Sequence, residues 1–167
     1  MPKRSFLFLY LLLLTNVICG QTLEYQFNRI DINQGLSNNQ VNCIFKDSTG
    51  FLWLGTVSGL NRFDGYRFTV FQHELRDSSS IADNSVNKIM AGPGGRLWVQ
   101  TRSGINVYDP VTNTFDRHPE KLLQQWGIPG NTITNIIKDK NRKYWFLSPH
   151  NGLYLVYGNG RAQHFSH

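Results

Sequence analysis

The chain has 167 residues, of which 40% are hydrophobic and 13% aromatic, so it can bury a sizeable core and does not have the composition of a disordered protein. Its formal net charge is +6, from 17 Lys and Arg against 11 Asp and Glu, and the cations are scattered singly along the chain. Without a basic stripe to neutralise phosphates, the sequence argues against a nucleic-acid partner.

Residues 1–20 have the pattern of a secretory signal peptide. A basic pair precedes an apolar run from Phe6 to Leu14, which is shorter than the roughly 20 residues that a membrane-spanning helix needs. We expect cleavage after Gly20 and a periplasmic or secreted mature chain. The alternative is a lipoprotein anchored at Cys19, which is disfavoured because the residue before a lipidated cysteine is normally small and here is Ile18.

Residues 21–35 are expected to contain an orphan outer strand that belongs to no complete repeat. The stretch from Thr22 to Ile32 carries the aromatic and β-branched residues Tyr25, Phe27 and Ile30, which favour an extended conformation. Its nearest counterpart is the last strand of the first repeat, described next.

The rest of the chain repeats three times with a period near 45 residues. Three tryptophans and three glycines recur at matching positions, with one residue inserted in the third copy: Trp53, Trp98, Trp145, Gly59, Gly104 and Gly152. Because the tryptophans stand in the middle of equivalent strands, packing between copies is their expected role. A repeat of this period built from short strands indicates radial or linear repetition.

Each copy is predicted to form four short strands separated by turn residues. The predicted strands are 41–46, 51–56, 60–63 and 66–72 in the first copy, 86–90, 96–101, 105–108 and 114–118 in the second, and 133–137, 144–147, 153–157 and 161–165 in the third. The consecutive apolar residues Cys43, Ile44 and Phe45 predict that the first strand is buried on both faces.

Four antiparallel strands per unit predict an all-β fold of β-propeller blades, with blade repeats at 36–72, 81–118 and 128–165. Each blade is a small sheet with two apolar faces, so it must stack on its neighbours. Three blades are fewer than the four to eight of known propellers, so we expect an incomplete ring, either as the amino-terminal piece of a longer array or as a truncated gene product.

The first copy resembles a known family, the two-component regulator propeller repeat of bacterial hybrid two-component sensors. The similar segments are 35–41 (GLSNNQV), 47–56 (DSTGFLWLGT) and 59–65 (GLNRFDG). The later copies drift, with Gly92 in place of the aspartate and Arg142 in place of the turn glycine.

The resemblance implies a non-enzymatic periplasmic module that senses an oligosaccharide released from a glycan, or another small ligand. In a full-length relative, further propeller blades and a membrane-linked histidine kinase follow, and signalling proceeds through propeller geometry or a homodimer contact. Two other classes stay open, a secreted propeller enzyme of the lyase kind and a scaffold for protein partners.

Strand alternation places the second-to-third turn of every blade at the same end as the connections between blades. The copies differ most there, and divergent loops on a shared scaffold are where specificity usually resides. We therefore expect ligand-binding residues at Arg102, His150 and Asn151. Trp126 either covers the end of a sheet from a short helix or stacks on a sugar ring beside them.

No catalytic or metal-binding constellation is predicted. The five histidines lack the spacing of metal ligands, and the aspartates fall at turns, where they commonly bond to their own backbone. We expect no metal, no cofactor and no catalytic residue.

Overall fold

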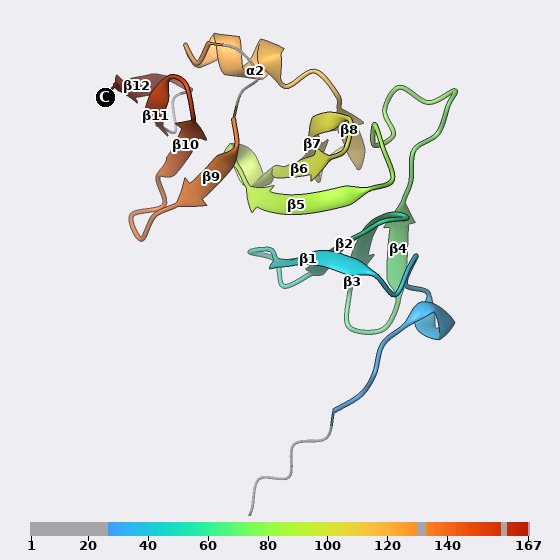
Figure 1. The fold of residues 1–167 in the computed structure, drawn as a ribbon. Coiled ribbons are helices and arrows are strands. Elements are labelled where there is room, and N and C mark those ends of the chain that lie inside the picture. The colour runs from blue at the N-terminus through green and yellow to red at the C-terminus, as the bar shows by residue number, and fades with distance from the viewer. Residues whose placement is uncertain (1–26, 130–132, 158–159, 167) are drawn as a thin grey trace, which may run out of the picture.

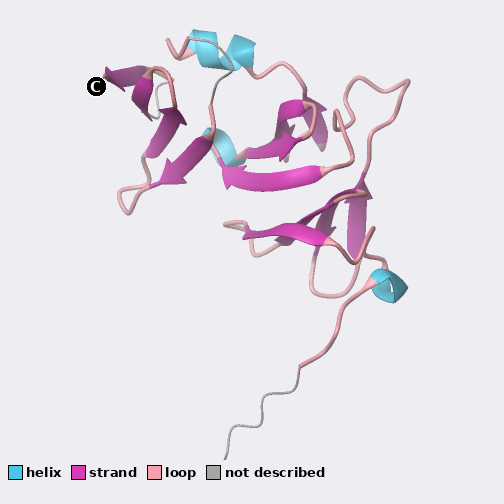
Figure 2. Ribbon diagram, in the orientation of Figure 1, coloured by secondary structure: helices cyan, strands magenta, loops and turns pink. Residues whose placement is uncertain are grey.

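The computed structural model describes residues 27–129, 133–157 and 160–166, and strands dominate this part of the chain (Figure 2). The strands form three four-stranded antiparallel sheets, which confirms the prediction of an all-β fold built from propeller blades, without a closed ring among the described residues. The predicted leader and residues 22–26 of the predicted orphan strand lie outside the described residues.

Each blade is a meander in which the strands follow one another in chain order. Blade 1 contains β1 (Val41–Lys46), β2 (Leu52–Thr56), β3 (Gly59–Phe63) and β4 (Phe68–Phe71). Blade 2 contains β5 (Val86–Ala91), β6 (Leu97–Thr101), β7 (Gly104–Asp109) and β8 (Thr114–Asp116). Blade 3 contains β9 (Asn135–Lys138), β10 (Tyr144–Ser148), β11 (Gly152–Val156) and β12 (Ala162–Phe165).

The described part also holds helix α2 (Glu120–Gln125) and 3-10 helices at Ile32–Gln34 and Pro93–Gly95. Helix α2 belongs to the connection between blades 2 and 3 (Figure 1). No helix within the described ranges is long and apolar enough to cross a membrane.

The three blades form an arc in which the first strands β1, β5 and β9 lie next to one another (Figure 1). Strand pairing sorts the side chains of each blade onto two faces. We call the face toward the preceding blade the leading face and the face toward the following blade the trailing face. The core consists of two clusters, one between blades 1 and 2 and one between blades 2 and 3.

The repeated tryptophans lie on the trailing faces. Trp53 is buried against Tyr108 of blade 2, with ring centroids 5.0 Å apart. Trp98 is buried against Phe146 of blade 3, with centroids 5.3 Å apart. Each tryptophan therefore joins its own blade to the next blade along the chain.

The prediction that the first strand is buried on both faces is wrong for β1. Ile44 lies on the leading face of blade 1 and is 63% exposed, whereas its counterparts Ile89 and Ile136 are 8% and 7% exposed. The difference arises because blades 1 and 2 cover the leading faces of blades 2 and 3, but no sheet of the described chain covers the leading face of blade 1.

The predicted strand from Thr22 to Ile32 is also wrong over its described part. Residues 27–30 have no regular secondary structure, and Ile32–Gln34 form a 3-10 helix. Asp31 caps this helix: its carboxylate accepts from the Asn33 N–H at 2.9 Å, and its own N–H donates to the Gln34 side chain at 2.8 Å. These reciprocal bonds stabilise a helical turn in place of an extended strand.

Candidate functional site

Asp47, in the turn between β1 and β2, uses both carboxylate oxygens for hydrogen bonds inside blade 1. Its Oδ1 accepts hydrogen bonds from the backbone N–H groups of Thr49 at 2.9 Å and Phe51 at 3.0 Å. Its Oδ2 accepts from the indole Nε1 of Trp53 at 2.7 Å. Partial burial acts to raise the pKa of Asp47, but the bonds from Thr49, Trp53 and Phe51 outweigh it and hold the pKa below its usual range.

Blade 3 repeats this arrangement and blade 2 lacks it. Asp139 accepts from the Lys143 N–H at 2.9 Å and from Trp145 Nε1 at 3.2 Å, and the Lys143 bond is the main cause of its lowered pKa. Blade 2 has Gly92 at this position, and Trp98 Nε1 is the only buried side-chain nitrogen or oxygen without a hydrogen-bond partner in the described chain. The missing carboxylate thus leaves one indole donor unpaired.

A buried asparagine performs a second structural task in blades 1 and 2. Asn61 and Asn106 are both almost completely buried on the leading faces of their blades. Their Oδ1 atoms accept from the N–H of Ser37 at 2.9 Å and of Ala82 at 2.8 Å. Each asparagine therefore fastens the connection that precedes its blade, so the repeat motif serves the scaffold and recognition has to be sought elsewhere.

The predicted ligand-binding residues Arg102, His150 and Asn151 lie in the second-to-third turns of blades 2 and 3. Arg102 and His150 are exposed, and the Arg102 N–H donates to the Ser85 carbonyl at 3.1 Å. This bond brings the turn of blade 2 against the connection from blade 1. Asn151 is half-buried, and its carbonyl contacts Nε2 of His164. A ligand at these turns stays a prediction.

Trp126 lies apart from those turns. Its ring packs against Trp98 and Phe146, with centroids 6.3 Å and 5.6 Å away. Its carbonyl accepts from the N–H of Ala162, which begins β12 at the end of blade 3 opposite the turn that holds His150. The ring therefore packs between blades 2 and 3, and the binding of a sugar by Trp126 stays a prediction.

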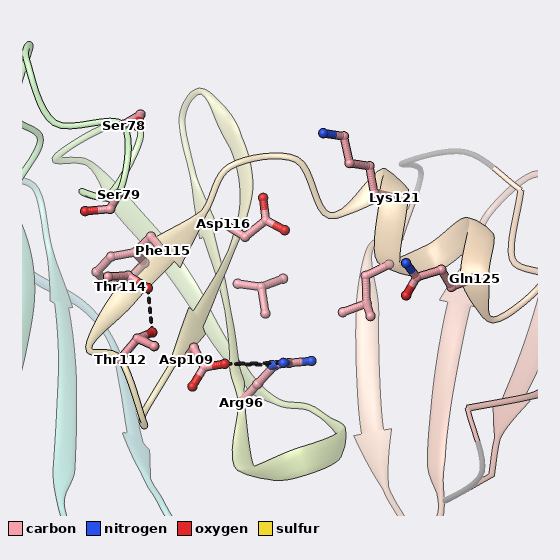
Figure 3. A pocket seen from close by; sticks show the side chains of 12 residues that line it. Ser78, Ser79, Arg96, Asp109, Thr112, Thr114, Phe115, Asp116, Lys121 and Gln125 are labelled. Carbon is pink, nitrogen blue, oxygen red and sulfur yellow. Dashed lines mark hydrogen bonds and ion pairs between the residues drawn. The ribbon is translucent and has the colours of Figure 1, made fainter.

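A cavity with a volume of about 570 Å³ opens between the outer part of blade 2 and helix α2. Polar side chains surround a small apolar floor (Figure 3). The lining residues are Ser78, Ser79, Arg96, Val107, Asp109, Thr112, Thr114, Phe115, Asp116, Lys121, Leu122 and Gln125. Three of these residues, Val107, Phe115 and Leu122, are apolar, so the cavity is more polar than most small-molecule sites and suits a ligand that is rich in hydrogen-bonding groups.

Two charged residues on blade 2 set one wall of the cavity. Arg96 donates from Nε and Nη2 to the Asp109 carboxylate, both at 3.3 Å, as Figure 3 shows. The Val111 N–H is the main cause that lowers the pKa of Asp109; partial burial opposes it and Arg96 adds to it. Asp109 is therefore ionised near neutral pH and holds the Arg96 guanidinium in place.

The connection between blades 1 and 2 forms the second wall because it is tied to β8. The Phe115 N–H donates to the Ser79 carbonyl at 2.7 Å. Arg117 donates to the Asp77 carbonyl at 2.7 Å and the Ser80 carbonyl at 2.8 Å. These bonds fix the connection between β4 and β5 along the outer strand of blade 2, so Ser78 and Ser79 line the cavity from a backbone that is held in place.

Helix α2 supplies the third wall. Its buried Leu123 packs in the core between blades 2 and 3, which leaves Lys121, Leu122 and Gln125 along the cavity. Sequence reasoning did not predict this cavity. The sequence does place the long connections 72–83 and 119–131 on the expected recognition face, and both contribute lining residues to the cavity.

Metal binding has no candidate here, because the described residues contain no cluster of three or more His, Cys, Asp or Glu side chains that could hold an ion.

Two comparisons with known sequences give matches. Residues 35–58 match the family model of the two component regulator propeller. The chain is also 39% identical over 62 residues to Histidine kinase P4 of Formosa agariphila, a match that covers 37% of this chain and 4% of the relative.

Solved structures give weaker likenesses. The extracellular domain of BT3049 from B. thetaiotaomicron, described as a hybrid two component system, is 25% identical with a TM-score of 0.43, and the match covers 86% of this chain and 27% of that one. The extracellular domain of BT4673 from the same organism is 23% identical with a TM-score of 0.35, covering 84% and 23%. The chain thus spans only a small part of the relatives that it matches, and any family assignment rests on the sequence matches.

Proposed function

From the family match over residues 35–58 and the similarity to a histidine kinase, we propose that this chain belongs to the two-component regulator propeller family and is a ligand-sensing module of a two-component signalling protein that acts in the periplasm. The observation that carries the proposal is the cavity between blade 2 and helix α2, since a sensor needs a built site for its ligand. The repeat motif itself supports only the scaffold, because its aspartates and asparagines are used in internal hydrogen bonds.

The chemistry of the cavity favours a polyhydroxylated ligand, and we propose an oligosaccharide released from a glycan. A sugar ring presents hydroxyl groups that both donate and accept hydrogen bonds, together with apolar C–H faces. Asp116 offers an acceptor, Lys121 a donor and Gln125 both, while Leu122 and Val107 supply apolar surface. The volume of about 570 Å³ lies within the usual range for small-molecule sites.

Signalling in the proposal uses the inter-blade position of the cavity. Its walls come from blade 2, from the connection that precedes blade 2 and from the helix that leads to blade 3. A ligand that contacts all three walls would favour one relative placement of blades 2 and 3 over others. In a longer chain this change would reach a membrane-linked histidine kinase.

Isothermal titration calorimetry of the chain against a panel of neutral and acidic oligosaccharides tests the proposal. We expect at least one to bind, and we expect Asp116→Ala and Lys121→Ala each to weaken its binding about tenfold or more, the loss for a hydrogen bond to a charged group. Lys121→Ala should change the free energy of unfolding by no more than about 0.5 kcal/mol. Asp116→Ala also removes the acceptor of the His118 N–H, which lies 2.8 Å from Oδ1, so its unfolding free energy is measured beside its binding.

The matched controls are Arg102→Ala and His150→Ala, which remove exposed side chains from the blade-end turns. These two variants should bind as the unchanged chain does. The reverse pattern, with binding lost in the turn variants and kept in the cavity variants, would move the ligand site to the turns that carry Arg102, His150 and Asn151. Absence of binding to every member of the panel would reject the glycan class.

A further inference from the structure

Two neighbouring clefts open at the end of the blades that holds the turns between first and second strands, opposite the turns of Arg102 and His150. Their volumes are about 330 Å³ and 360 Å³. The first cleft has walls from all three blades, and the second lies between blades 2 and 3. The 3-10 turn Pro93–Gly95 borders both clefts and Tyr144 lines both, so the two clefts adjoin.

The first cleft lies where blade 2 departs from the repeat. In blades 1 and 3 the first strand ends with a lysine, Lys46 or Lys138, and the turn aspartate follows it. Blade 2 has Ala91 and Gly92 at these two positions, and both line the cleft. The small residues of blade 2 therefore leave a hollow that the lysines of blades 1 and 3 border.

The second cleft lies where blade 3 departs from the repeat. Arg142 stands where blade 1 has the turn glycine Gly50, and both residues have a positive φ, 63° and 100°. Arginine is unfavourable in this left-handed conformation, because its Cβ crowds the backbone. Asp139 holds the turn by accepting from the N–H groups of Asn141 at 2.8 Å and Lys143 at 2.9 Å. Strained residues of this kind cluster at ligand-binding positions.

Cations dominate the lining of the two clefts. The Lys and Arg residues among the lining are Lys46, Arg96, Lys138, Arg142 and Lys143. The one carboxylate among the described lining residues is Asp47, which already accepts hydrogen bonds at both oxygens. Arg96 is paired with Asp109, whereas the other four cations form no ion pair with any described carboxylate. The clefts therefore carry an excess of positive charge.

Tyrosine rings lie beside two of these cations. Lys138 Nζ is 5.5 Å from the centre of the Tyr144 ring, and Lys143 Nζ is 5.8 Å from the centre of the Tyr157 ring. These contacts favour ammonium positions near the cleft walls. The rings also give each cleft a flat apolar surface. A ligand that combines negative charge with the apolar face of a sugar ring can use both kinds of group.

We propose that this end of the blades is a second binding site, which takes an acidic oligosaccharide with one charged sugar residue in each cleft. Carboxylate or sulfate groups on the ligand meet Lys46 and Lys138 in the first cleft and Arg142 and Lys143 in the second. Each cleft has the volume of a small-molecule site, which suits a sugar ring better than a planar membrane surface.

This site is separate from the cavity beside helix α2. The two share Arg96 and no other described lining residue, so the present proposal and the proposed function can fail independently.

Isothermal titration calorimetry of the chain with tetragalacturonate tests the proposal. The methyl ester of the same tetrasaccharide is the uncharged match, and a sulfated galactan tetrasaccharide compares the two kinds of acid. We expect one or both acids to bind, with an affinity that falls as salt is added. The ester should bind at least about tenfold more weakly than tetragalacturonate if the carboxylate form is the ligand.

Arg142→Gly is the most direct variant, because it removes the cation and restores the residue that blade 1 has in this turn. It should weaken binding of the acid about tenfold and leave the chain at least as stable to urea. Lys138→Ala should have a similar effect from the first cleft. The matched control is Lys140→Ala, in the same turn but outside both linings, which should change the affinity less than about threefold.

Four results would overturn the proposal. The first is that neither acid binds, including the case in which the chain binds phosphatidylglycerol vesicles instead. The second is that the ester binds as tightly as tetragalacturonate while the sulfated tetrasaccharide does not bind. The third is an equal loss for Lys140→Ala and Arg142→Gly, which would mean a diffuse attraction to charge. The fourth is binding that is lost in Lys121→Ala and kept in Arg142→Gly, which would place the acid in the cavity beside helix α2.

Discussion

Blades 1 and 2 have the same strand plan but differ in the turn between their first two strands. In blade 1 the turn aspartate accepts the indole N–H of Trp53 at 2.7 Å. In blade 2 that residue is Gly92, and the N–H of Trp98 has no partner. Both tryptophans are buried, so packing against the next blade is enough to place the ring, and the hydrogen bond adds stability to a position that is already set.

Gly92 also takes part in the packing of blade 2. A Cβ atom at this position would overlap Nε1 and Cδ1 of the Trp98 indole. The backbone there is extended, with φ −122° and ψ 175°, so glycine is not needed for conformational reasons. The indole of Trp98 occupies the space that a side chain at position 92 would take. The ring can therefore have this position only because residue 92 has no side chain.

The largest effect expected from this comparison is that of Gly92→Ala. The added methyl group must displace a buried indole, and overpacking of this kind costs about 1–3 kcal/mol of unfolding free energy. Urea denaturation followed by circular dichroism measures the loss. The control is Ser48→Ala on the exposed turn of blade 1, which should change stability by less than about 0.5 kcal/mol. Equal midpoints for Gly92→Ala and the unchanged chain would show that the ring at Trp98 moves freely.

A pair of phenylalanine substitutions isolates the hydrogen bond. Trp53→Phe removes the donor to Asp47, whereas Trp98→Phe removes a donor that has no partner, and the loss of ring area is the same in both. We expect Trp53→Phe to lose about 1–2 kcal/mol more unfolding free energy than Trp98→Phe. The difference between the two urea midpoints is the measurement, and equal losses would mean that the bond to Asp47 contributes nothing net.

Much of the scaffold follows from the sequence because local rules set it. Alternating apolar residues and turn dipeptides place the ends of each predicted blade strand within two residues of those observed, for example 51–56 against Leu52–Thr56 and 105–108 against Gly104–Asp109. The segment around Asp31, which we predicted as a strand, contains a local signal for a helix start, because Asp31 and Gln34 have the spacing of a capping box.

The site depends on contacts that sequence patterns do not record. The cavity exists because Arg117 holds the connection from blade 1 along β8 and because Leu123 anchors helix α2 between blades. Nothing in the local sequence shows that Ser79 and Lys121, far apart in the chain, line one space. The same holds for Trp126, whose packing on Trp98 needs the blade arrangement.

Blade 3 lacks both partners of the hydrogen bond that joins the buried asparagine to the preceding connection in blades 1 and 2. The residue equivalent to Ser37 and Ala82 is Pro129, which has no backbone N–H to donate. At the position of the acceptor Asn61, blade 3 has Tyr154, which stacks on His164 with centroids 4.4 Å apart. Donor and acceptor are absent together, so no buried polar group is left unpaired by the change.

The smallest expected effect concerns the pH dependence of the blade 1 turn. The pKa of Asp47 is below its unfolded value of about 3.9, so the carboxylate stabilises the fold above that pH, and this contribution is lost as pH falls through the lower folded pKa.

Asp47→Asn keeps an acceptor but removes the charge, and should cost about 0.5–1 kcal/mol of unfolding free energy at pH 7. The gap in urea midpoint between the two chains should narrow as the pH falls below about 4, because the carboxylate that distinguishes them is then protonated. For Asp139→Asn we expect a change in the same direction with pH, because the pKa of Asp139 is lowered chiefly by the bond from the Lys143 N–H. A gap that stays constant over this range would mean that the geometry of the turn, and not the ionised carboxylate, stabilises the tryptophan, and blade 2 would then differ from blade 1 in packing alone.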